Sequence, residues 1–149
     1  MNSAQISQIE DALGLSLPSS YKDAVLNYPF PEIDAIRYHH FFECAELVIT
    51  ENLAHRKNGW FNILWPNDYF VIGDDGCGNT FFMLAGEQTI YFADHDGGAH
   101  PIDQLPECLY SDNLREYTNE LLEFHNEEQQ LDLLASEQIL NKKWWQFWI

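Results

Sequence analysis

Three short runs of β-branched and aromatic residues between Tyr69 and Asp94 constrain the fold of this chain more than any other feature. The runs "YFVI", "TFFML" and "TIYFAD" are separated by "GDDGCGN" and "AGEQ". Such runs with short, glycine-containing connections predict an antiparallel β-meander over about residues 69–94. The runs are apolar at nearly every position. Both faces of the sheet are therefore expected to be covered, one by helices and the other by loops around Trp60 and Trp65.

Helical periodicity precedes the predicted sheet. The first predicted helix ends before Gly14, a residue type favoured just after a helix, and its apolar face is formed by Ile6, Ile9 and Leu13. The second begins near Pro18, and its inner face is formed by Tyr21, Val25 and Tyr28. Residues 33–42 have an extended, aromatic character. Residues 45–59 have the composition of a helix, although "LVIT" within them is also compatible with a strand.

The part of the chain that follows the predicted sheet is again helical in pattern. "HDGGAHPIDQLP" predicts a loop, and Asp112 or Asn113 is placed to cap the next helix. One face of that helix is formed by Leu114, Tyr117, Leu121 and Phe124. Further apolar residues predict that it continues, or that another helix follows: Leu131, Leu134, Ala135 and Ile139. The expected architecture is α+β, a single domain over residues 1–149 with a C-terminal helical extension and aromatic tail from about residue 126.

Charge and cysteine content limit the partners and the compartment. The 149 residues carry a net charge of −17, which repels nucleic acid and anionic membranes and favours a basic protein partner. The three cysteines lie far apart without a disulfide framework, which predicts reduced thiols in the cytoplasm. The start of the chain has no pattern of a secretory signal, and no apolar run approaches the length of a membrane span. The oligomeric state is not indicated.

The stretch "GDDGCGN" admits several interpretations. A phosphate-binding loop would need a lysine after its last glycine, and Asp74 and Asp75 would repel a phosphate. An EF-hand would need acids at alternate positions and a distant glutamate. Weak divalent-cation binding remains open, because Asp94 and Asp96 in "DHDGG" approach the first pair if the hairpins align. The favoured interpretation is a hairpin tip, since Asp, Asn and Gly adopt the conformations that turns require.

The sequence also contains one candidate catalytic pair and one candidate metal-binding segment. Cys77 and His95 are candidates for a nucleophile pair, but the surrounding carboxylates oppose the lowered thiol pKa that such a nucleophile needs. "HHFFEC" contains residue types that suit zinc, namely His39, His40, Glu43 and Cys44. Histidines and aromatic residues on an irregular segment are the favoured interpretation. No catalytic residue, no metal site and no cofactor is therefore predicted.

An acidic stripe is the most informative surface feature. Glutamates follow one another at i, i+4, i+7 and i+11 of the predicted C-terminal helix: Glu116, Glu120, Glu123 and Glu127. Like charges at this spacing oppose helix formation, and a solvated face usually mixes signs. The stripe therefore indicates either a solubilising surface or a surface that meets a basic partner. The tail "KKWWQFWI" favours docking onto the domain or a protein interface over a membrane anchor.

The order of these motifs resembles the SUKH superfamily of the Smi/Knr type over roughly residues 6–125. "ISQIEDALGLSLPSSYKDAVLNY" is similar to the opening helices of that family, and "VIGDDGCGNTFFML" is similar to its central hairpin. "TIYFADHDGG" is similar to the strand and turn that follow. The chain departs from the pattern at "NYPFP" and after Phe124. The residues that match the family motif look structural: Leu17, Pro18, Tyr21, Gly73, Gly78 and Phe82.

This resemblance implies a compact α+β domain without catalysis. Bacterial members of the family are mostly immunity proteins that bind and block a toxin in the producing cell, and fungal members regulate wall assembly. The expected function is therefore neutralisation of a cognate toxin domain, plausibly a basic nuclease, through an acidic surface. The alternative is a regulatory or scaffold domain with an endogenous partner. The expected partner-binding residues are Glu116, Glu120, Glu123, Glu127, Asp74, Asp75, Asp94 and Asp96.

Overall fold

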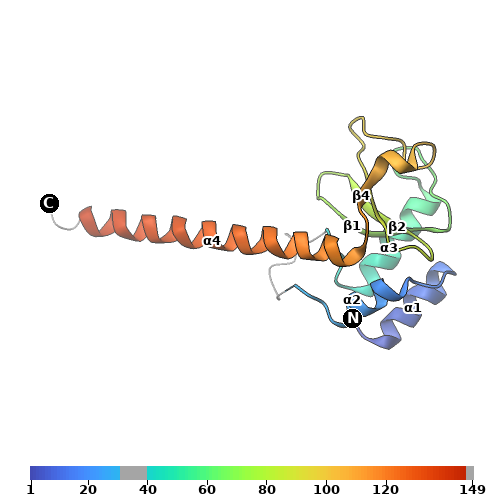
Figure 1. Cartoon of the computed structure of the whole chain (residues 1–149), viewed down its shortest axis with the longest axis horizontal. Coiled ribbons are helices and arrows are strands. Elements are labelled where there is room, and N and C mark those ends of the chain that lie inside the picture. The colour runs from blue at the N-terminus through green and yellow to red at the C-terminus, as the bar shows by residue number, and fades with distance from the viewer. Residues whose placement is uncertain (31–39, 147–149) are drawn as a thin grey trace. The chain divides into compact units, whose positions relative to one another are not determined.

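The computed structural model describes residues 1–30 and 40–146 of the chain. Over these residues the elements follow one another as α1 (Ser3–Leu13), α2 (Ser19–Leu26), α3 (Ala45–Lys57), β1 (Tyr69–Asp74), β2 (Thr80–Leu84), β3 (Ile90–Ala93), the 3-10 helix η1 (Leu105–Cys108), β4 (Leu109–Ser111) and α4 (Leu114–Gln146) (Figure 1). The predicted α+β class is confirmed. The chain divides into two compact units, Met1–Tyr117 and Thr118–Ile149. The first unit contains the sheet.

The sheet is an antiparallel meander with strand order β1-β2-β3-β4. The three predicted strands are confirmed, and "GDDGCGN" connects β1 to β2 as the predicted hairpin tip. The fourth strand was not predicted, because its three residues are too few to show a period and follow η1 directly. A bulge between Val71 and Gly73 shifts the register of β1 against β2. The carbonyl of the intervening Ile72 accepts a hydrogen bond from Phe42 N–H at 2.8 Å.

The two N-terminal helices form as predicted, with one difference. Asn2 and Gln5 close a reciprocal capping box at the start of α1, and Gly14 ends α1 in the left-handed conformation with φ of 64°. The second helix ends at Leu26, so Tyr28 lies beyond it and not on its inner face. There the Tyr28 hydroxyl donates to the carbonyl of Phe41 at 2.9 Å. "NYPFP" ends α2 two residues before Tyr28, because proline cannot continue a helix.

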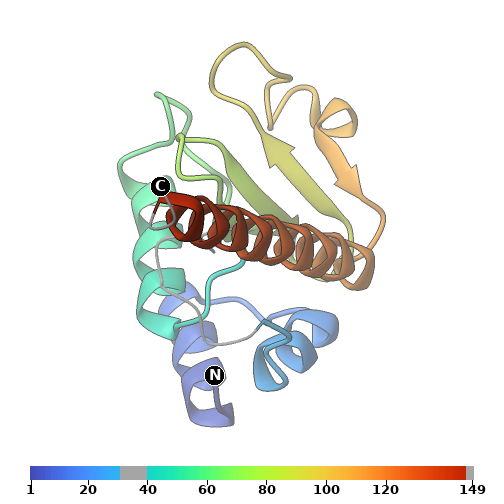
Figure 2. The same cartoon turned by 90° about the vertical axis from the view of Figure 1, so that its left-hand side faces the viewer.

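The third helix resolves the ambiguity at "LVIT" in favour of helix. It carries Glu46 in its first turn and the cations Arg56 and Lys57 in its last turn, which complements the helix dipole. It packs against α1 and along the β1 edge of the sheet (Figure 2). The extended segment predicted at residues 33–42 lies mostly outside the described residues.

The core occupies both faces of the sheet, as predicted. On one face Phe70 of β1 meets Tyr21 of α2 with ring centroids 4.7 Å apart. On the other face Trp65 packs edge-on against Phe82 at 4.8 Å, and Trp60 packs against Trp65. The aromatic runs of the meander are therefore buried between helices and the Trp60–Trp65 loop.

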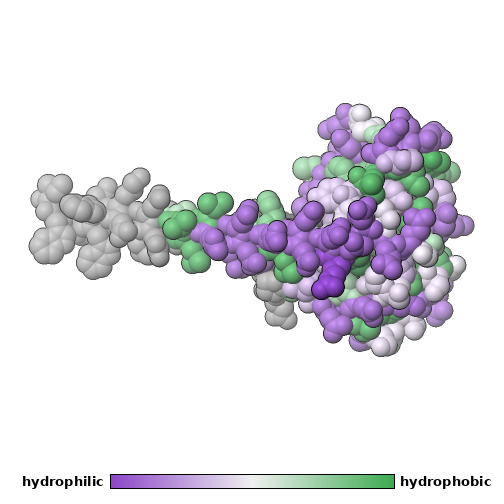
Figure 3. Space-filling model, viewed as in Figure 1, coloured by the Kyte–Doolittle hydropathy of each residue, from purple (hydrophilic) through white to green (hydrophobic). Residues whose placement is uncertain are grey.

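The second unit consists of α4 from Thr118 onward, and α4 is one continuous helix to Gln146. Asn113 caps its start, since Asn113 Oδ1 accepts from the N–H of Glu116 at 3.0 Å. The visible surface of α4 is mainly hydrophilic with hydrophobic patches further along it (Figure 3). Large apolar side chains on it are more than half exposed: Phe124, Leu131, Leu133 and Leu134. Among the described helices none combines the length and apolar character needed to cross a bilayer.

Candidate functional site

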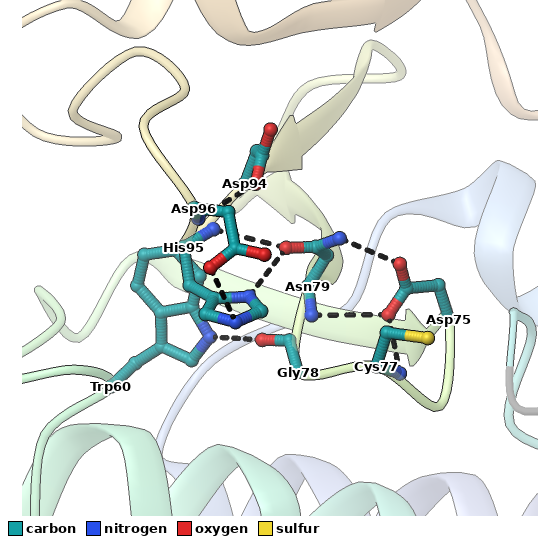
Figure 4. A network of polar contacts seen from close by, with 8 residues as sticks. All are labelled: Trp60, Asp75, Cys77, Gly78, Asn79, Asp94, His95 and Asp96. Carbon is teal, nitrogen blue, oxygen red and sulfur yellow. Dashed lines mark hydrogen bonds and ion pairs between the residues drawn. The ribbon is translucent and has the colours of Figure 1, made fainter.

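A chain of polar contacts joins the two acidic turns at the tip of the sheet (Figure 4). Asp75, between β1 and β2, accepts from the side-chain amide of Asn79 at 2.7 Å and from two backbone N–H groups. Asn79 Oδ1 accepts from both the backbone N–H and the ring Nδ1 of His95, at 3.0 and 2.8 Å. His95 Nε2 lies 3.2 Å from Asp96 Oδ1. We call these four residues the tip relay. It brings two of the predicted acidic positions onto one network.

The donors and acceptors of the tip relay follow from its carboxylates. A carboxylate only accepts, so the Asn79 Nδ2 group must face Asp75 and the amide oxygen must face His95. His95 Nδ1 is then the donor to Asn79. His95 Nε2 faces a second carboxylate, on Asp96, and donates to it only when the ring carries both protons. The arrangement thus offers an acceptor to each ring nitrogen of His95.

Aromatic residues hold the tip relay from one side. The indole N–H of Trp60 donates to the carbonyl of Gly78 at 2.9 Å, and the ring of Phe61 stacks on His95 with centroids 4.4 Å apart. Gly78 has a φ of 104°, and a Cβ there would lie 3.2 Å from the His95 ring. A side chain at this position would therefore meet both backbone strain and the ring. The family-matching glycine is structural here, as predicted.

The turn that presents Phe61 is strained. Trp60 and Ile63 exchange two backbone hydrogen bonds of 2.8 Å, and the residues between them, Phe61 and Asn62, have φ of 45° and 68°. Two central residues with positive φ are typical of a type I′ turn, where Asn-Gly is preferred. A left-handed conformation costs a bulky residue roughly 1–2 kcal/mol. Phe61 nevertheless remains 54% exposed. Strain of this kind clusters at functional sites.

A pocket of about 390 Å³ opens beside this turn, between α3 and the β1–β2 hairpin. We call it the hairpin pocket; it is lined by Phe42, Leu47, Glu51, His55, Trp60, Phe61, Val71, Asp74, Gly76, Gly78, Asn79 and Thr80. The lining residues from α3 follow one another at i, i+4 and i+8, which places Leu47, Glu51 and His55 on one face of the helix. Sequence reasoning did not find this site. Its lining comes from four separate segments. The turn at Phe61 and Asn62 lacks the Asn-Gly pattern from which such a turn could have been predicted.

The half-buried side chain of His55 lines the hairpin pocket. Its Nδ1 is 2.8 Å from the carbonyl of Glu51, and its Nε2 is 3.3 Å from Thr80 Oγ1. Burial lowers the pKa of His55, against smaller opposing effects of the Glu51 carbonyl and the Asp74 carboxylate. The ring is therefore neutral at pH 7, and the formal charge of the pocket lining comes from Glu51 and Asp74.

The aspartates predicted as partner-binding residues also accept hydrogen bonds from backbone N–H groups of their own turns. Asp74 Oδ1 accepts from Gly76 N–H at 2.7 Å, and Asp94 Oδ1 accepts from Asp96 N–H at 2.8 Å. Burial alone would raise the pKa of Asp75, but the hydrogen bonds from Cys77 and Asn79 lower it by more. Asp75 thus remains charged at neutral pH. Asp96 is the most open of the group, with 85% of its side chain exposed.

The predicted glutamate stripe lies on α4. Glu116, Glu120, Glu123 and Glu127 are all exposed. Glu116 belongs to the first compact unit and the other three to the second. Whether these side chains bind a partner stays a prediction.

The catalytic alternative finds no support in the geometry of the tip. Cys77 is exposed, and its sulfur points away from His95 (Figure 4). The His95 ring nitrogens face Asn79 and Asp96. Among the side chains that the structure describes, no three or more of His, Cys, Asp or Glu gather in a way that could hold a metal ion. His39 of the "HHFFEC" candidate lies outside the described residues.

Comparison with known proteins gives one match. The model of the SMI1 / KNR4 family (SUKH-1) matches residues 1–127, which include both opening helices, the whole meander and the first part of α4. No match was found among curated proteins or among solved structures. The resemblance of the opening helices and the central hairpin is confirmed by this match. The chain therefore belongs to the SMI1 / KNR4 family (SUKH-1).

Proposed function

We propose that this protein is a non-catalytic immunity protein that binds and neutralises a cognate bacterial toxin domain. Membership of the family suggests a function in immunity or in the regulation of wall assembly. The observation that carries the proposal is the exposed glutamate stripe on α4, in a chain whose net charge is −17. A like-charged helical stripe costs stability, and contact with a basic partner would offset that cost.

The partner expected from this surface is a basic protein, plausibly a nuclease. A nuclease needs a cationic cleft for its phosphate-rich substrate, and an acidic surface of an inhibitor is complementary to such a cleft. Electrostatic steering would also raise the rate of association by roughly 10- to 1,000-fold at low salt. The acidic tip around Asp74, Asp75, Asp94 and Asp96 is the second candidate contact surface. Binding alone would block the toxin, so no catalytic group is required.

The alternative function is a regulatory or scaffold domain with an endogenous partner. The family also includes regulators of wall assembly, which favours this second candidate. In that case the same acidic surfaces would meet a host protein, and the chain would protect against no toxin.

A rescue assay tests the proposal. The C-terminal domain of the protein encoded beside this gene is expressed with and without the full chain, and surviving cells are counted. Survival that depends on the chain supports immunity. Toxicity that the chain does not relieve favours the regulatory alternative. Two matched variants extend the assay. The stripe variant changes Glu116, Glu120, Glu123 and Glu127 to Gln. The control variant changes four exposed acids outside both proposed surfaces to Asn or Gln, namely Asp11, Glu46, Asp68 and Glu107, so that both variants lose the same charge.

A further inference from the structure

The part of α4 that forms the second compact unit carries exposed apolar side chains. Over its described residues this unit is α4 alone, so it has no core of its own. Phe124 is 52% exposed, Leu131 65% and Leu134 55%, and Ala135 is exposed as well. Helices in proteins are stabilised mainly by the packing of an apolar face, and exposed apolar surface of this kind marks interaction sites. We therefore expect another surface to cover it.

The four residues share one face of α4. Leu131 and Ala135 follow Phe124 at i+7 and i+11, and Leu134 lies at the edge of the same face. We call these four residues the helix seam. Leu133 is 64% exposed, but it follows Phe124 by nine residues, or about two and a half turns, and so lies on the opposite face.

Charge is divided unequally between the two ends of this part of α4. Residues 120–128 contain four acids and no lysine or arginine, whereas residues 138–146 contain two lysines and no acid. A second copy of the helix packed in parallel and in register would set acid against acid and lysine against lysine, which is unfavourable. An antiparallel copy would set the acidic segment of one chain against the basic segment of the other. The charges are thus self-complementary in the antiparallel orientation.

The apolar residues select the same arrangement. Leu131, Leu134 and Ala135 meet their own copies in an antiparallel pair only if the two-fold axis passes close to Leu133. Residues 120–128 then face residues 138–146 of the second copy, as the charges favour. The apolar cluster and the charge distribution, which are separate features of the sequence, therefore agree on one register. An interface of this kind uses the same patch on both copies and closes at a dimer.

We propose that α4 pairs with α4 of a second copy of this chain, in an antiparallel dimer centred close to Leu133. The two helix seams pack on each other, and the basic segment of each copy lies beside the acidic segment of its partner. Four acids against two lysines leave each end of the pair negative, so the attraction for a basic toxin is kept. The dimer goes beyond the proposed function, and it does not depend on which partner the chain binds.

Analytical ultracentrifugation of the full chain tests the association. We expect the apparent mass to rise from that of one chain to that of two between about 1 and 100 µM, because one helix face makes a small interface. Leu131→Gln should weaken dimerisation roughly tenfold or more, since it removes apolar contact from both copies. Leu133→Gln is the matched control, with the same change of residue type at a similarly exposed position on the opposite face. It should alter the dissociation constant by less than about threefold.

A distance between two spin labels tests the orientation. The exposed Cys44 and Cys77 are changed to serine, and a nitroxide is attached to Asn119→Cys, an exposed position near the start of the second unit. In the antiparallel dimer the labelled positions are separated by the rise of about 28 helical residues, so we expect the labels about 40 Å apart. A parallel, in-register dimer would bring them within about 20 Å of each other.

Three results would each overturn the proposal. They are a single-chain mass at all concentrations tested, equal weakening of the dimer by Leu131→Gln and Leu133→Gln, and labels that lie within about 20 Å of each other. Circular dichroism of both leucine variants shows that α4 is retained, so that loss of the dimer is not loss of the helix. The toxin takes no part in these measurements. Their outcome is therefore separate from that of the rescue assay.

Discussion

The side-chain amide of Asn52 both donates a hydrogen bond to the backbone of Val71 and accepts one from it. Asn52 Oδ1 accepts from the N–H of Val71 at 2.8 Å, and Asn52 Nδ2 donates to its carbonyl at 2.9 Å. Val71 lies on β1, which is an edge of the sheet in the observed strand order. The Asn52 amide thus takes the place of a neighbouring strand, while both residues are almost fully buried. In this way α3 satisfies edge groups that would otherwise be left without partners.

Replacing Asn52 by leucine should therefore be strongly destabilising. The change keeps the side-chain size but leaves a buried N–H and a buried carbonyl unpaired, at roughly 1–3 kcal/mol each. We expect Asn52→Leu to lower the free energy of unfolding by about 3 kcal/mol in urea titrations. Asn58→Leu, at the exposed end of the same helix, should change it by less than about 0.5 kcal/mol. Equal effects of the two substitutions would contradict the role assigned to Asn52.

Glu10 connects the first two helices. One carboxylate oxygen, Oε1, lies 2.6 Å from Lys22 Nζ and accepts from Leu17 N–H at 2.8 Å. The hydrogen bond from Lys22 is the largest of the effects that lower the pKa of Glu10, and the Leu17 N–H adds to it. A lowered carboxyl pKa stabilises the fold above the unfolded value of 4.5, and this contribution disappears as the pH falls through the folded value.

We accordingly expect Glu10→Gln to cost up to about 1 kcal/mol near pH 7, as is usual for a partly exposed charged contact. The difference between wild type and variant should be smaller at about pH 2 than near pH 7, because protonation of the native carboxyl removes this contribution. Chemical unfolding at the two pH values measures it. Asp11→Asn, an exposed neighbour, provides the control. A Glu10 effect that does not depend on pH would show that the charge is irrelevant.

His55 should make the stability of the fold depend on pH in a higher range than Glu10 does. Its pKa is lowered from 6.5, chiefly because burial disfavours the charged ring. Below 6.5 the unfolded chain therefore binds more protons at this site than the folded chain does, so stability falls as the pH decreases from 7.5 toward 5.5. His55→Gln should reduce this loss. Identical pH profiles for wild type and His55→Gln would refute the assignment.

Phe61 should be nearly neutral for stability despite its size. Substitution by asparagine relieves a strained backbone, worth roughly 1–2 kcal/mol, and loses the ring contacts with His95 and Trp60, a loss of similar size. We expect Phe61→Asn to change the free energy of unfolding by less than about 1 kcal/mol. Phe70→Ala, at a fully buried aromatic, should cost about 3–5 kcal/mol. A loss above about 2 kcal/mol for Phe61→Asn would show that the ring contacts of Phe61 stabilise the fold by more than the backbone strain costs.

The glutamate stripe should control association with a basic partner more than the lifetime of the complex. Changing Glu116, Glu120, Glu123 and Glu127 to glutamine removes long-range attraction, so the association rate should fall roughly tenfold or more at low salt. The salt dependence of that rate should become shallower. Stopped-flow or surface-based kinetics with the toxin domain from the rescue assay measure the association rate and its salt dependence. The variant at Asp11, Glu46, Asp68 and Glu107 corrects for net charge, and equal slowing by both variants would count against the stripe as a contact.

Much of the fold follows from the sequence because it depends on near neighbours. The spacing of Ile6, Ile9 and Leu13 and the glycine after them predict α1 and its end, since helix periodicity and left-handed caps are local properties. The β-branched and aromatic runs predict β1, β2 and β3 for the same reason. The glutamate stripe is visible because a single helix arranges it. In contrast, β4 has three residues, which is too short to carry a period of its own.

The candidate site was decided by tertiary contacts between distant segments. Asn52 reads as an ordinary polar position in a helix until α3 is placed against the edge of β1, 19 residues further on. The tip relay depends on Asn79 and His95 meeting across two turns, and the hairpin pocket on α3 meeting the β1–β2 tip. Phe61 and Asn62 show no turn signature, so only the paired backbone of Trp60 and Ile63 places them in positive φ. Sequence patterns report how residues a few positions apart share a face, whereas a pocket and a bonded network require the long-range packing that only the folded chain supplies.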